Sequence, residues 1–161
     1  MDISAVKEVR KRLGDKGVAI LFKLNKINNI TEAYRDNDGR LLVSDFCFDG
    51  MEYRIINVHA PNKETDRKMF LMGLKEWCIN NTMIIGDFNV VLSKSDISNN
   101  NVYKNDVSRG KLIQLISDTN LIDIWRIINN RKRGFTRRQI VNGKLKQGIK
   151  VFVMLPLYLG R

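Results

Sequence analysis

The sequence has few of the residues that build disulfide frameworks and metal sites. Its 161 residues include two cysteines, one histidine and two prolines. Both cysteines, Cys47 and Cys78, lie within apolar patterns, and no cysteine or histidine pair has the spacing of zinc ligands. We therefore expect buried, reduced thiols and no zinc site.

Long apolar runs are also missing. The longest run, VFVMLPLYL at 151–159, has nine residues and is interrupted by Pro156, whereas a helix that spans a bilayer needs about 20 apolar residues. The first residues, MDISAVKEVRKRLGDKG, mix both charge signs and lack the apolar segment of a secretory signal. These features predict an intracellular protein of the nucleus or cytoplasm, neither secreted nor bound to a membrane.

Acidic residues are absent from the last part of the chain. The net charge is +11, and 10 of the 28 basic residues but none of the 17 acidic ones follow Asp123. Such a concentration of positive charge favours a polyanionic partner, most often nucleic acid. A solvated basic tail is the alternative interpretation of the same run.

Apolar alternation predicts an antiparallel meander in the first third of the chain. Strands are predicted over 17–24, 40–48 and 52–60. The dipeptide Asp49-Gly50 is a tight hairpin signal between the second and third strands. Asp38-Gly39 predicts another hairpin, which would join the first two.

Helices and strands alternate in the rest of the chain. A helix is predicted over roughly 64–80, followed by a strand over 82–86. The polar loop 92–106 is long enough to indicate function or disorder. A second helix, capped by Asp106 or Ser108, and a short extended segment complete the pattern, which favours a mixed-sheet α/β sandwich.

Polar side chains follow two of the predicted strands, in INVHAPN and in IIGDFN. The helix between these strands favours a parallel pairing, which places both carboxyl ends at one edge of the sheet. His59, Asp87 and Asn89 would then converge. A carboxylate that orients water, an amide that holds a phosphate oxygen and a proton donor are what phosphodiester cleavage needs, usually with a metal ion.

The motifs, their order and their spacing resemble the endonuclease/exonuclease/phosphatase superfamily, and within it the apurinic-endonuclease-like nuclease domain of non-LTR (LINE-type) retrotransposons. The resemblance covers roughly residues 16–140. It rests on the stretches KGVAILF, DNDGRLLVSDFCFDGMEYRIINVHAPN, MIIGDFNVVL, SRGKLIQLISDTNLIDIWR and GFT. A phosphatase acting on phosphoinositides or nucleotides shares the superfamily motifs and is a more distant alternative.

The resemblance implies an α/β (α+β) fold that forms part of a four-layer αββα sandwich with mixed β-sheets, and DNA nicking that depends on Mg²⁺ or Mn²⁺. Asp87 matches the acid that activates water, Asn89 matches the amide that contacts the scissile phosphate, and His59 stands where the family more often has tyrosine. A DNA-contacting role is implied for Thr136 in GFT. Phosphate contact is predicted for the cluster around it, Arg131, Arg133, Arg137 and Arg138.

The departures from the family pattern predict a partial domain that lacks both ends. The family's metal-binding glutamate has no counterpart, because Glu8 lies in a stretch that reads as helical and charged. Val151 stands where an aspartate is expected, and the family's terminal Asp-His pair is absent. We expect a partial, incomplete domain over 1–146 and an atypical tail over 147–161.

The same departures predict a chain that is inactive or weakly active alone. The alternative function is a catalytically dead remnant that binds the DNA phosphate backbone through its basic C-terminal segment. Neither interpretation predicts an obligate protein partner.

Overall fold

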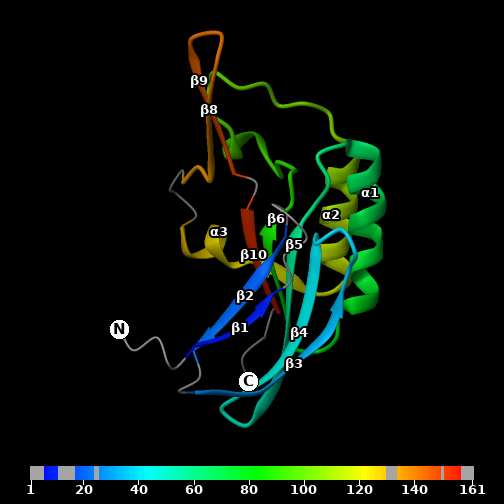
Figure 1. Cartoon of the computed structure of the whole chain (residues 1–161). Helices are drawn as coiled ribbons and strands as arrows, with labels where there is room; N and C mark the ends of the chain where they lie inside the picture. The colour runs from blue at the N-terminus through cyan, green and yellow to red at the C-terminus, as the bar shows by residue number, and fades with distance from the viewer. Residues whose placement is uncertain (1–5, 11–16, 24–25, 130–133, 150, 157–161) are drawn as a thin grey trace.

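The computed structural model describes residues 6–10, 17–23, 26–129, 134–149 and 151–156. Six strands form the main sheet, in the spatial order β3-β4-β5-β6-β10-β7 (Figure 1). They are β3 (Ile27–Arg35), β4 (Leu41–Phe48), β5 (Met51–His59), β6 (Thr82–Asp87), β7 (Leu121–Asp123) and β10 (Val151–Pro156). The β5–β6 pair is parallel and every other neighbouring pair is antiparallel, so the sheet is mixed as predicted.

Two helices lie side by side against one face of this sheet (Figure 1). They are α1 (Glu64–Gly73), which continues as a 3₁₀ helix over Leu74–Trp77, and α2 (Val107–Asp118). Asp106 caps α2 as predicted, since its side chain accepts a hydrogen bond from the Ser108 N–H. The segment predicted as extended over 121–125 is β7 followed by a short helix, α3 (Ile124–Ile128).

Two hydrophobic cores lie on opposite faces of β4. Leu41 and Val43 pack into the core shared with α1 and α2, whereas Leu42 and Phe46 pack into a second core with β2. Alternate residues of a strand point to opposite faces, so a strand between two cores is buried on both. Helices, main sheet and the small β1–β2 sheet are three of the layers of the predicted αββα sandwich, which confirms the fold class.

The amino-terminal strands differ from the prediction. β2 (Ala19–Lys23) pairs antiparallel with β1 (Val6–Arg10) in a separate two-stranded sheet. The hairpin at Asp38-Gly39 joins β4 to β3 instead, and β3 was not predicted. The helical interpretation of the stretch around Glu8 is wrong, because Glu8 lies in β1 opposite Leu21.

The last part of the chain also enters the sheets. β8 (Arg137–Val141) and β9 (Lys144–Gly148) form a hairpin that projects beyond the carboxyl ends of β5 and β6 (Figure 1). β10 lies between β6 and β7. The boundary proposed at residue 147 therefore falls within β9. Within the described ranges, no helix is long and apolar enough to cross a membrane.

Candidate active site

The parallel pairing of β5 and β6 brings the predicted catalytic residues to one edge of the sheet. His59 and Asp87 are register partners at the last positions of the two strands. The backbone continues this pairing for one more residue, because the Ala60 N–H donates to the Asp87 carbonyl at 2.8 Å. The side chain of His59 is exposed. The predicted convergence of strand ends is therefore present in the structure.

Gly86 allows β6 to approach β5 closely just before Asp87. Its φ is +126°, and a Cβ at this position would lie 2.0 Å from the Val58 carbonyl oxygen. A residue with a side chain would be both strained and in collision here. The glycine of the GDFN motif is therefore required by the geometry of the strand end.

Asp87 and Asn89 form a tight turn directly after this glycine. The Asp87 Oδ1 accepts a hydrogen bond from the Asn89 N–H at 2.8 Å, and Asn89 has a φ of +51°. Phe88, between them, is fully buried and anchors the turn in the core. Asn89 is 7% exposed, and its Nδ2 donates to the Ala60 carbonyl at 2.8 Å. Asp87 and Asn89 thus stabilise the turn, and the turn keeps both residues next to the end of β5.

A cleft of about 440 Å³ opens beside Asn89. Its walls come from the loop after β5, the loop before α2 and the β8–β9 hairpin. Basic side chains outnumber acidic ones in its lining, which includes Arg67, Lys104, Arg109 and Lys146 against Glu64 and Asp106. Concave sites with convergent polar groups are typical of ligand-binding sites. The excess of positive charge favours an anionic ligand.

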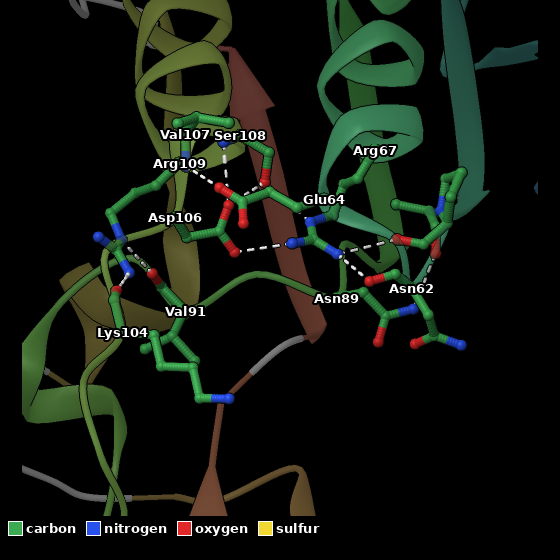
Figure 2. Close-up of polar contacts among 12 residues, drawn as sticks. Asn62, Glu64, Arg67, Asn89, Val91, Lys104, Asp106, Val107, Ser108 and Arg109 are labelled. Carbon is green, nitrogen blue, oxygen red and sulfur yellow. Dashed lines mark hydrogen bonds and ion pairs between the residues drawn. The ribbon is translucent and has the colours of Figure 1, made fainter.

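A buried arginine of α1 lines the cleft beside the loop after β5. It was not among the predicted site residues. Arg67 is 5% exposed and forms an ion pair with Asp106 at 2.7 Å, from Nη2 to Oδ2 (Figure 2). Burial alone would raise the pKa of the Asp106 carboxyl, but hydrogen bonds from Ser108 and the charge of Arg67 outweigh it, so the pKa is lowered. Arg67 precedes Leu71 and Leu74 at helical spacing, and this position on the apolar face was the available signal.

The second wall of the cleft is the polar loop 92–106, which packs along β9. The Ser98 N–H donates to the Gln147 carbonyl at 3.0 Å, and the Ile149 N–H donates to the Asp96 carbonyl at 2.8 Å. The Asp96 side chain is fully buried, where it accepts hydrogen bonds from the Ser93 N–H and from Arg126. The loop is thus an ordered support for the hairpin.

The predicted DNA-contacting residues lie at or near this hairpin. Thr136 and Arg138 are exposed, and the Thr136 hydroxyl donates a hydrogen bond to the Gly148 carbonyl at 3.5 Å. Arg137 begins β8. Arg131 and Arg133 lie outside the described residues. Two further hairpin residues, Gln139 and Lys146, line the cleft.

The described residues do not fit a preformed metal site. Within the described ranges, no group of three or more histidine, cysteine, aspartate or glutamate side chains could hold a metal ion. β10 runs antiparallel to β6 with Val151 as the register partner of Asp87. At this pair of register partners, β6 therefore carries a carboxylate, whereas β10 carries an apolar valine.

No protein-family model matches the chain. The chain is 31% identical over 136 residues to the transposon TX1 uncharacterized 149 kDa protein of Xenopus laevis, a match that covers 81% of this chain. It spans about a tenth (10%) of the length of that relative.

Several solved structures share the fold. The endonuclease domain of TRAS1, a telomere-specific non-LTR retrotransposon, has a TM-score of 0.63 and 11% identity, over 94% of this chain and 67% of its own. The 3′-5′ exonuclease NExo from Neisseria meningitidis has a TM-score of 0.68 and 17% identity, over 96% and 68%. The AP endonuclease LMAP from Leishmania major has a TM-score of 0.61 and 15% identity, over 94% and 62%.

Proposed function

We propose that the chain is the endonuclease-type domain of a non-LTR retrotransposon protein and a member of the endonuclease/exonuclease/phosphatase superfamily, whose fold it shares. Its substrate is DNA, and its reaction is phosphodiester hydrolysis. The sequence relative is a transposon protein and one structural relative is a retrotransposon endonuclease domain, which supports this assignment. Residues 1–146 form the proposed partial domain, within which roughly residues 16–140 resemble the family in sequence.

Two observations support the proposal: His59 pairs with Asp87 at the ends of β5 and β6, and Asn89, two residues after Asp87, lines the basic cleft. The Asp87 carboxylate orients a water molecule and takes up its proton as the water oxygen bonds to phosphorus. Asn89 supplies a polar contact to a non-bridging phosphate oxygen. His59 donates a proton to the leaving oxygen as the phosphorus–oxygen bond breaks.

DNA is held by phosphate contacts along the hairpin and the cleft. Arg137 and Arg138 start the hairpin, and Lys146 lies on its other strand at the cleft wall. Arg131 and Arg133 precede it in the sequence. Arginine and lysine supply the sequence-independent part of DNA affinity, and that part weakens as salt rises.

A second candidate function is DNA binding with little or no hydrolysis. The register partner of Asp87 is Val151, where the family resemblance implies an aspartate. Loss of one member of a cooperating catalytic unit lowers rates by orders of magnitude, on the order of 10⁴ in well-studied hydrolases. We therefore propose that this chain alone is inactive or weakly active, and that hydrolysis by the intact domain uses Mg²⁺ or Mn²⁺.

Nicking of supercoiled plasmid separates the two functions. The chain is incubated with Mg²⁺ or Mn²⁺, with and without EDTA, beside the variant Asp87→Ala. Nicking that disappears in the variant would establish the nuclease and overturn the inactive alternative. Salt-dependent filter binding of duplex DNA without nicking would establish the binding function. A chain that neither nicks nor binds DNA would overturn both.

A further inference from the structure

We infer that Arg67 is a positioning residue, whose buried guanidinium holds the loop 60–62 and, through it, the side chain of Asn89 beside the cleft. The inference rests on the proposed function for its biological meaning, because the site that Arg67 would position is the proposed phosphodiester site. The geometry itself is independent of that function.

Two side chains hold three consecutive carbonyl groups of the loop after β5. Asn89 Nδ2 donates to the Ala60 carbonyl at 2.8 Å. Arg67 Nη1 donates to the next two carbonyls, those of Pro61 at 3.0 Å and Asn62 at 2.7 Å. The Asn89 contact and the Arg67 contacts are therefore adjacent along one stretch of backbone. A shift of that backbone would move the acceptor of the Asn89 amide.

The loop depends on side chains because the sheet ladder ends at its first residue. The Ala60 N–H donates to the Asp87 carbonyl at 2.8 Å. Pro61 has no N–H and interrupts the pairing with β6. The carbonyls of Pro61 and Asn62 therefore accept hydrogen bonds from outside the sheet ladder. Arg67 supplies them from one side, one turn into α1.

Helix α2 fixes Arg67 from the opposite side. Arg67 Nε donates to Ser108 Oγ at 2.8 Å, and Nη2 donates to Asp106 Oδ2 at 2.7 Å. A parallel contact joins the same two helix starts, since the Glu64 carboxylate accepts from the Val107 N–H. Figure 2 shows these contacts between the first turns of α1 and α2 at the cleft. Arg67 thus links the loop, α1 and α2 at a single point.

This arrangement is better suited to fixing geometry than to adding stability. A buried ion pair loses much of its Coulomb energy to desolvation, and replacing both partners with neutral residues is often tolerated. A guanidinium donates in several fixed directions at once, whereas the lysine ammonium is a compact charge. Here one guanidinium makes four donor–acceptor contacts, two to the start of α2 and two to the loop after β5. The arginine at this position therefore fixes the orientation of the loop 60–62 relative to the start of α2.

The double variant Arg67→Met/Asp106→Asn tests the inference in the full chain without DNA. Asparagine can still cap α2, and no unpaired buried charge remains. Two NMR readouts follow the loop: hydrogen exchange of the Ala60 backbone amide and the chemical shift of the Asn89 side-chain amide. We expect at least tenfold faster exchange at Ala60 and a displaced Asn89 signal, while exchange at the core residue Ile84 stays unchanged.

A matched control is available at the other end of the same strands. Arg54 pairs with Asp45 and donates to the Trp77 carbonyl at 3.3 Å. The variant Arg54→Met/Asp45→Asn removes an arginine–aspartate pair that is partly buried, and neither readout at Ala60 or Asn89 should change. Unchanged readouts in a folded Arg67→Met/Asp106→Asn chain, or equal changes in the control, would overturn the inference.

Two further measurements keep the test decisive. If the double variant does not fold, Arg67→Lys is used, since it keeps the charge opposite Asp106 and lacks the fork that reaches two carbonyls. The same two readouts then decide. Duplex DNA affinity is expected to fall about tenfold with loop displacement, and not in the Arg54 control. A wild-type chain that binds no DNA would overturn the proposed function alone, because the amide readouts still decide the role of Arg67.

Discussion

The carboxylate of Asp87 accepts a hydrogen bond from the backbone N–H of Asn89, with 2.8 Å between Oδ1 and N. The residue proposed to activate water therefore also closes the turn that carries its neighbour. Asparagine side chains close the same kind of turn. The charge of Asp87 and its structural role can thus be separated by substitution.

The variant Asp87→Asn is expected to keep the fold and lose catalysis. Its side-chain oxygen can still accept from Asn89, so we expect a melting temperature within a few degrees of wild type. Any Mg²⁺-dependent plasmid nicking is expected to fall by a factor on the order of 10³ or more. Nicking kinetics and thermal melts check this. Undiminished nicking in Asp87→Asn would remove Asp87 from the catalytic role.

The variant Gly86→Ala is expected to be strongly destabilised. Strained backbone costs about 1–3 kcal/mol, and overpacking against fixed backbone costs a further 1–3 kcal/mol or so. Gly50→Ala is the control, because Gly50 also has a positive φ, +76°, but a Cβ added to it would meet nothing within 4 Å. In urea unfolding, the loss in free energy of unfolding should be several-fold larger for Gly86→Ala than for Gly50→Ala. Equal losses would refute the close approach.

Stability is expected to fall in acid through Asp106. Its pKa is lowered in the folded chain, so its contribution is fully present above the ordinary carboxyl pKa of 3.8 and is lost as pH falls through the lower folded pKa. Urea unfolding from pH 6 to pH 2.5 should therefore show less acid loss in Arg67→Met/Asp106→Asn than in wild type. Parallel curves for the two proteins would contradict this assignment.

The thiol of Cys78 is expected to react slowly in the folded chain. Burial raises the pKa of Cys78 to about 11, although the nearby Arg54 charge opposes the shift. At pH 8 the thiolate fraction, which is the reactive form, is then about 100-fold below that of a thiol of ordinary pKa. Iodoacetamide labelling in a Cys47→Ser background should accelerate sharply in urea. Fast labelling of the folded chain would show an accessible thiolate.

The salt dependence of DNA binding is expected to depend on the basic side chains of the β8–β9 hairpin. Each lost phosphate contact should reduce the slope of log affinity against log salt by about one. We therefore expect reduced slopes for Lys146→Gln and Arg138→Gln in filter binding across a salt series. Lys75→Gln is the control, because Lys75 pairs with Asp118 on the helical layer at 2.8 Å. An equal reduction in Lys75→Gln would point to a diffuse charge effect.

Sequence pattern predicted the strand-end site because its signals are local. The helix between β5 and β6 favoured parallel pairing, and Gly86 marked the strand end. β3 was missed because only Ile30 of its residues is buried, so it lacks an apolar alternation. Arg67 was missed because its partners Asp106 and Ser108 lie 39 and 41 residues away. Its place on the apolar face of α1 suggests burial, but it does not reveal which groups the guanidinium contacts.

Because β10 lies between β6 and β7, the main sheet can be completed only when the end of the chain has been synthesised. The partner of β6 on one side, β5, precedes it in the sequence, whereas the partner on its other side is complete only after Val151–Pro156 have been synthesised. During translation the strand that bears Asp87 therefore presents a free edge, and free edges invite pairing with other chains. The strand pairing beside Asp87 is thus among the last that the growing chain can form, and until then β6 offers an edge for pairing with other chains.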